Sequence, residues 1–162
     1  MAAIYEQLLA LQDRAAEIIS GIDYLSGYDV ATESKGDLKK QIAQALSTLG
    51  LCMIVLTPET RIKARNGDRI VRDVTVEIGC YETPILNSKS GVRKTALAAA
   101  AAIATAIEGA SNGQVDAEFA SSDDPLSSFL LNDNDISLIP DDKTGILIYR
   151  VSAHTEISTI KE

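Results

Sequence analysis

Apolar residues recur every three or four positions in two stretches near the start of the chain, which places them on one face of an α-helix. In residues 3–20 acidic and amide side chains lie between these apolar positions, and Gly21 follows, which is typical of a helix end. In residues 38–49 the same spacing follows Asp37, a favoured N-cap residue, and ends at Gly50. The pattern predicts an α-helix in each stretch.

A third helix is predicted over residues 92–108, where the chain is dominated by alanine and is followed by Gly109. Alanine has little side-chain bulk, so a neighbouring backbone can approach this helix closely. The segment that follows, residues 110–135, is rich in Ser, Asn and Asp and is predicted to be a long acidic loop.

Four strands are predicted from their apolar patterns. Residues 51–56 (LCMIVL) are continuously apolar, which is typical of a short strand buried on both faces. Residues 69–81 alternate between apolar and polar positions, which is typical of a strand with one buried face. Residues 136–139 and 146–157 flank a Pro-Asp-Asp-Lys-Thr-Gly turn and predict a hairpin.

The polar residues 61–68, which contain the turn dipeptide Asn66-Gly67, are interpreted as the loop of an antiparallel hairpin that joins the first two strands. The predicted order is therefore α-α-β-β-α-β-β. We expect one domain over residues 1–162, of the α+β class, with a mainly antiparallel four-stranded sheet and the helices packed on one face.

Composition narrows the function classes. The 162 residues are 46% hydrophobic and 23% charged, and the formal net charge of -8 disfavours broad binding to nucleic acid or to an anionic membrane. One histidine and two cysteines leave little for a metal site or for acyl transfer. Cys52 and Cys80 lie in apolar runs and are expected to be reduced core residues. Glu6 and Asp13 interrupt the N-terminal apolar pattern, so we expect no signal peptide and synthesis in the cytosol.

The charge is segregated along the chain. Residues 111–142 hold eight acidic side chains and no Lys or Arg, namely Asp116, Glu118, Asp123, Asp124, Asp133, Asp135, Asp141 and Asp142. Residues 61–72 hold five basic side chains against Asp68 alone, namely Arg61, Lys63, Arg65, Arg69 and Arg72. Opposite patches on one domain suit a head-to-tail contact between copies, with the acidic segment facing a neighbour, a partner or a lumen. The alternative is that both patches are solvated surface.

The segment 88–95 (SKSGVRKT) lies where a phosphate-binding loop would lie, between a strand and a helix. A glycine should directly precede Lys94 and another should lie five residues earlier, but Arg93 and Ser88 occupy those positions. A small enzyme domain that binds an anion or a nucleotide through this loop is therefore kept as the alternative function. Neither the lone His154 nor the Asp-rich segment has the partners or spacing of a catalytic or EF-hand site.

Residues 69–109 combine a strand reading VTVEIGCYETPILN, a short Ser/Lys/Gly loop and the helix KTALAAAAAIATAIEG. This combination resembles small tail-completion, or tail-terminator-like, proteins of tailed phages and prophages. Glu82, Pro84 and Asn87 match the Glu-x-Pro-x-x-Asn element of those proteins.

The resemblance implies a structural virion protein of the tail or neck that is made in the host cytoplasm. It implies a ring of identical subunits at the head–tail junction or tail end, in contact with other neck or tail proteins. It implies no catalytic residue, cofactor or metal, and no membrane or specific nucleic-acid binding, although DNA can pass through a lumen. An acidic lumen would repel the DNA backbone and let it slide. An adaptor in a cellular secretion or injection apparatus shares this architecture and stays open.

Overall fold

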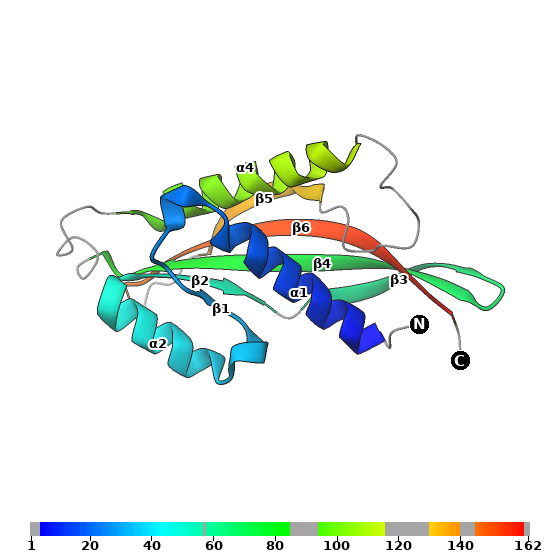
Figure 1. The fold of residues 1–162 in the computed structure, drawn as a ribbon, viewed down its shortest axis with the longest axis horizontal. Helices are drawn as coiled ribbons and strands as arrows, with labels where there is room; N and C mark the ends of the chain where they lie inside the picture. The colour runs from blue at the N-terminus through cyan, green and yellow to red at the C-terminus, as the bar shows by residue number, and fades with distance from the viewer. Residues whose placement is uncertain (1–3, 57, 85–93, 116–129, 140–144, 161–162) are drawn as a thin grey trace.

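The computed structural model describes residues 4–56, 58–84, 94–115, 130–139 and 145–160 (Figure 1). The expected α+β class is confirmed, but the sheet has six strands and not four. In chain order the elements are α1 (Ile4–Ser20), β1 (Val30–Ala31), α2 (Leu38–Leu49), β2 (Leu51–Val55), β3 (Glu59–Asn66), β4 (Arg69–Glu82), α4 (Ala96–Val115), β5 (Leu130–Ile139) and β6 (Leu147–Ile160). Short 3₁₀ turns at Asp23–Leu25 and Glu33–Lys35 flank β1.

The strand order is β1-β2-β4-β6-β5, with β3 paired to β4 beside β2, and only the β1–β2 pair is parallel. Two strands were missed for different reasons. β1 has two residues, which is too short for any periodic pattern. β3 reads ETRIKARN and lies where a loop was expected, because six of its eight residues are polar and it runs into the turn dipeptide Asn66-Gly67. Ile62 and Ala64 alternate with charged residues, but two apolar positions do not indicate a buried face.

β2 and β3 lie along the same edge of β4 and together form one arm of a long hairpin. β2 pairs with Ile78–Glu82 and β3 pairs with Arg69–Thr75, so the predicted antiparallel pairing of 51–56 with 69–81 is confirmed. The turn itself is only Gly67-Asp68, with Gly67 at φ +59°. The tip of this hairpin extends beyond the helices (Figure 1).

The helices cover both faces of the sheet, so the expectation of helices on one face is wrong. α1 and α4 pack on the face that carries Leu51, Met53 and Val55 of β2. α2 packs on the opposite face, against Cys52 and Ile54. The continuous apolar run of β2 requires this arrangement, because all five of its residues are buried.

The predicted helix at 38–49 is confirmed with its caps. The Asp37 carboxylate accepts a hydrogen bond from the Lys40 backbone N–H at 3.3 Å, and Gly50 ends the helix at φ 73°. The predicted bounds of α4 are wrong at its C-terminal end, because the helix continues through Gly109 to Val115. An interior glycine costs a helix only about 1 kcal/mol and removes no hydrogen bond, so it need not end one.

The predicted loop at 110–135 is also wrong at both of its ends. Its first residues continue α4 and its last residues begin β5 at Leu130, six residues before the predicted start of that strand at Ile136. Residues 116–129 lie outside the described residues, and so do residues 140–144 of the predicted turn. β6 runs to Ile160, slightly past its predicted end.

Both cysteines are free and buried, as predicted, with 1% of Cys52 and none of Cys80 exposed. Burial raises the pKa of the Cys52 thiol to about 11 and the pKa of the Cys80 thiol to about 12. Both thiols therefore stay protonated at neutral pH, where only the thiolate is reactive.

We expect the free energy of unfolding to fall in alkaline solution. In the unfolded chain a thiol ionises with a pKa near about 8.5. The folded chain holds its thiol protons to higher pH, so their contribution is complete below about pH 8.5 and is lost as the pH rises through 11 and 12. Urea unfolding at several pH values should show a loss of up to about 1.4 kcal/mol per pH unit for each thiol. A Cys80→Ala variant should show a shallower loss, and an unchanged slope would contradict this assignment.

Candidate assembly surface

β3 is exposed along its whole length. All eight of its residues are exposed, and β4 is less buried opposite β3 than it is opposite β2. One edge of β3 pairs with β4, and within the described part of the chain no strand pairs with its other edge. The strand therefore presents backbone N–H and C=O groups and side chains of both faces to solvent.

The structure brings the five predicted basic residues together on this hairpin. Arg61, Lys63 and Arg65 lie on β3. Arg69 and Arg72 lie on the part of β4 that pairs with β3. The β3–β4 register shifts between Ile62 and Ala64, so Lys63 lies at a bulge. Arg69 donates a hydrogen bond through Nε to the Ser158 hydroxyl on β6.

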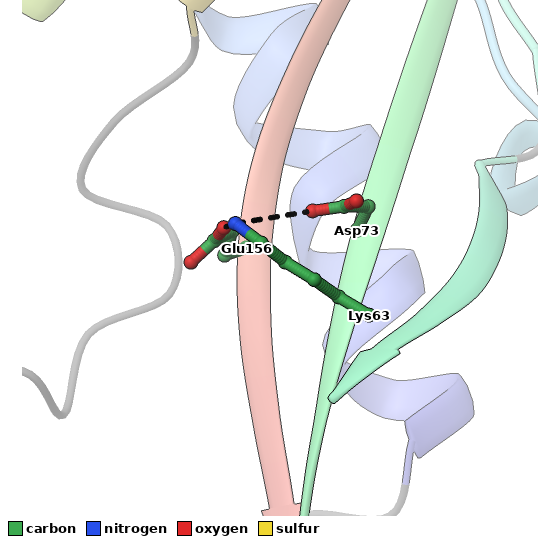
Figure 2. A network of polar contacts seen from close by, with 3 residues as sticks. All are labelled: Lys63, Asp73 and Glu156. Atoms are coloured by element: carbon green, nitrogen blue, oxygen red, sulfur yellow. Dashed lines mark hydrogen bonds and ion pairs between the residues drawn. The ribbon is translucent and has the colours of Figure 1, made fainter. Parts of the chain in front are cut away.

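Strand pairing also places acidic residues beside the basic ones, which the sequence analysis missed. The Lys63 ammonium contacts the Asp73 carboxylate of β4 at 4.0 Å and donates a hydrogen bond to Glu156 of β6 (Figure 2). This hydrogen bond raises the pKa of Lys63. Glu156 could be found only by knowing that β6 lies next to β4, because 93 residues separate it from Lys63.

Of the five basic residues, only Lys63 has an ion pair among the described residues, and two of the other four, Arg61 and Arg65, lie on the outer strand β3. Among the residues that the structure describes, neither Arg61 nor Arg65 has an ion-pair partner. Arg61 lies opposite Asp73 in the strand register, and Arg65 lies opposite Ile70, nearer the turn. These two guanidinium groups are available to an acidic partner.

The predicted acidic residues that the structure describes lie at the edge of the sheet opposite to β3. Asp133 and Asp135 are part of β5, the last strand in the sheet order. The β5–β6 register shifts between Leu131 and Ile136, so both aspartates belong to an irregular part of the strand. The Asp135 carboxylate accepts a hydrogen bond from the Ile136 N–H at 2.9 Å. Four other predicted residues, Asp116, Glu118, Asp123 and Asp124, lie outside the described residues.

The outer edge of β5 is open and partly apolar. Among the described strands only β6 pairs with β5. Leu138 and Ile139 near the end of this strand are 53% and 36% exposed. On the other side of the sheet, Ile62 of β3 is 38% exposed. Three described strands have an unpaired outer edge, namely β1, β3 and β5. β1 has only two residues and both are buried, whereas β3 and β5 are long and expose apolar side chains.

Glu82 of the Glu-x-Pro-x-x-Asn element holds the start of α4. Its side chain is completely buried, and its carboxylate accepts a hydrogen bond from the Ala96 backbone N–H at 3.3 Å. The Thr95 hydroxyl accepts a second one from the Ala98 N–H at 3.1 Å. A carboxylate is favourable here because the helix dipole is positive at its N-terminus. Pro84 follows β4 and is partly exposed, while Asn87 lies outside the described residues.

Lys94 points toward the connection between α1 and β1. It donates a hydrogen bond to the Tyr24 backbone carbonyl, and its ammonium lies 5.0 Å from the centre of the Tyr24 ring and 5.3 Å from that of Tyr28. These contacts, a hydrogen bond and two cation–π interactions, connect Lys94, two residues before α4, to the segment between α1 and β1. The glycine and serines of segment 88–93 lie outside the described residues.

No known protein family matches the chain, and no curated protein is a detectable relative. Within the described ranges no group of three or more His, Cys, Asp or Glu side chains could hold a metal ion. No helix in the same ranges is long and apolar enough to span a membrane. The resemblance to tail-completion proteins therefore stays a prediction from the residues of segment 69–109.

We expect Glu82→Gln to lower the free energy of unfolding by about 1–3 kcal/mol, because it removes a buried charge that favours the helix start. Glu82→Ala should cost more, since it also leaves the Ala96 N–H without its acceptor. Urea unfolding measures both variants. Glu108→Gln, on an exposed position of the same helix, is the matched control and should change little. Equal stabilities of Glu82→Gln and Glu108→Gln would contradict a capping role.

Proposed function

We propose that this chain is a non-enzymatic structural subunit of a phage or phage-like tail or neck, which assembles with its own copies into a ring that completes or joins the tail. The resemblance of segment 69–109 suggests the biological setting. The observation that carries the assembly part is a single sheet with two long outer strands that no described strand covers, the basic β3 and the acidic β5.

An exposed outer strand needs a physical explanation. An unpaired strand edge can pair with other chains, so proteins normally shorten, twist or cover it. Here β3 has eight residues, all of them exposed, and none of the described helices covers either of its faces. A neighbouring subunit would cover the strand and desolvate Ile62 together with the stems of the arginines. Self-assembly would therefore explain why this long strand is exposed, which the fold of an isolated subunit does not explain.

A ring suits the placement of charge better than a symmetric dimer does. The basic outer strand and the acidic outer strand lie at different edges of the sheet, so the favourable contact joins unlike surfaces. Contacts of this heterologous kind leave one surface free at each end, and they close into a ring when the rotation allows. Other neck or tail proteins would then bind the two flat sides of the ring, and DNA would pass through its lumen.

The alternative of an anion- or nucleotide-binding enzyme has less support. In a phosphate-binding loop the N-terminal N–H groups of the helix and a lysine would contact the ligand. In α4 the Ala96 and Ala98 N–H groups are already bonded to Glu82 and Thr95, and Lys94 is directed at two tyrosines. A buried carboxylate at the helix start would also repel a phosphate.

We expect the protein to self-associate in dilute salt and to dissociate as the salt concentration rises, because the proposed contact joins opposite charges. Raising the ionic strength from about 0.01 M to about 1 M shortens the Debye length from about 30 Å to about 3 Å. Sedimentation velocity over a range of protein concentrations measures the mass in each condition. A monomer in every condition, including high protein concentration without salt, would exclude the ring.

We expect millimolar phosphate, ADP and ATP to leave the melting temperature unchanged, after matching of ionic strength with sodium chloride. A ligand present at about 100 times its dissociation constant stabilises a protein by about 2.7 kcal/mol, which a thermal melt detects easily. A clear rise in the melting temperature with one of these anions, and none with chloride, would favour the enzyme alternative instead.

A further inference from the structure

The outer strands β3 and β5 run in opposite directions, carry opposite charges and are offset along the sheet. We propose that β3 of one copy pairs edge to edge with β5 of the next copy, as antiparallel strands, so that neighbouring sheets become continuous. This inference rests on the proposed self-assembly and names the strands that make it. The interface would be a β-sheet ladder between identical chains, completed by attraction between the basic side chains of β3 and the aspartates of β5.

Strand direction supports the pairing. The strands between the two edges follow the order β3, β4, β6, β5, and each neighbouring pair is antiparallel. With four alternating strands, β3 and β5 run in opposite directions. When copies are placed side by side in the same orientation, as around a rotation axis, β3 of one copy is therefore antiparallel to β5 of the next. The new ladder would have the same geometry as the ladders within the subunit.

Charge supports this partner and disfavours the simplest competitor. Arg61, Lys63 and Arg65 would face each other if two β3 strands paired, and like charges directly opposite one another destabilise a sheet. Against β5 the signs are opposite. Counted by residue number, an antiparallel alignment with Arg61 opposite Asp135 brings Lys63 level with Asp133 and Arg65 level with Leu131. Both strands carry a register shift in this region, so the alignment gives the level of the charges along the strands. The basic side chains of β3 thus disfavour pairing with a second β3 and favour pairing with β5.

The offset between the two edges fits a closed cylinder of strands. Through the register of β4 with β6, β3 is level with residues 154–160 of β6, whereas β5 pairs with residues 148–154. The midpoints differ by about six residues, or about 20 Å along the strands, and four strands measure about 19 Å across. A repeat with this shift tilts the strands by about 45° from the ring axis. Closed barrels typically have tilts of about 35–45°.

Charge reversal tests this interface directly. In Arg61→Glu/Arg65→Glu the β3 edge becomes acidic and should repel β5, which should weaken self-association at least about tenfold in sedimentation velocity at low salt. Asp133→Lys/Asp135→Lys should weaken it similarly. The variant that carries all four changes keeps the net charge of the natural chain and should assemble with itself. Mixed with the natural chain, it should form no joint species, because acidic β3 would then meet acidic β5.

The matched control is Lys39→Glu/Lys40→Glu, which changes the net charge equally at exposed positions of α2, away from both edges. It should keep the mass of the natural chain, and circular dichroism should show that every variant is folded. Oligomers that withstand both reversals would overturn the β3–β5 interface while leaving self-assembly intact. A natural chain that is monomeric throughout would overturn the proposed function as well. A four-fold variant that stays dissociated although it is folded would also overturn the pairing.

Discussion

The long antiparallel ladder between β4 and β6 is the interaction on which the rest of the fold depends. It runs without a shift from Arg69 opposite Ile160 to Glu82 opposite Leu147, so it links the buried end of the sheet to the exposed hairpin. At the buried end Val76, Ile78 and Val151 lie under the helices. At the other end the same two strands support β3 and place Glu156 beside Lys63. The same two strands thus connect the exposed hairpin to the core, although the core does not cover it.

The boundary between these two parts lies near the end of β2. There the side chain of Gln12 on α1 is buried, and it donates a hydrogen bond to the Val55 backbone carbonyl at 2.9 Å. Because an unpaired buried carbonyl costs about 1–3 kcal/mol, this amide stabilises the last residue of β2. The chain then continues along the same edge of β4 as β3, where no residue is buried. In the helical pattern of residues 3–20, Gln12 is one of the polar residues that lie between the apolar ones. No neighbouring residue in the sequence indicates that its side chain is buried.

How far the sequence predicted the structure depended on where each element makes its contacts. The helices at 4–20 and 38–49 and the strands at 51–55 and 69–82 were predicted because each buries a periodic set of apolar residues. The position of α2 on the opposite face was not predicted, since an apolar run such as β2 does not state which helix covers which side. The basic cluster was found from composition, whereas Asp73 and Glu156 became part of it only through strand order. The burial of Glu82 likewise depends on a helix that begins 14 residues later.

The polar sequence of β3 explains both why the strand escaped prediction and how it can serve assembly. A strand with two exposed faces cannot be apolar in a free subunit, because it would promote aggregation before the correct neighbour arrives. In the proposed assembly, its arginines and lysine would repel the β3 strand of a second copy. Its backbone edge nevertheless stays able to form a ladder. In the proposed ring the charges would decide which strand pairs with this edge, and the four-strand width of the sheet would decide in which direction that strand runs. The pairing partner of such a strand would be specified by the strand register and by the charges along its edge. Neither can be known before the strand order of the sheet is known.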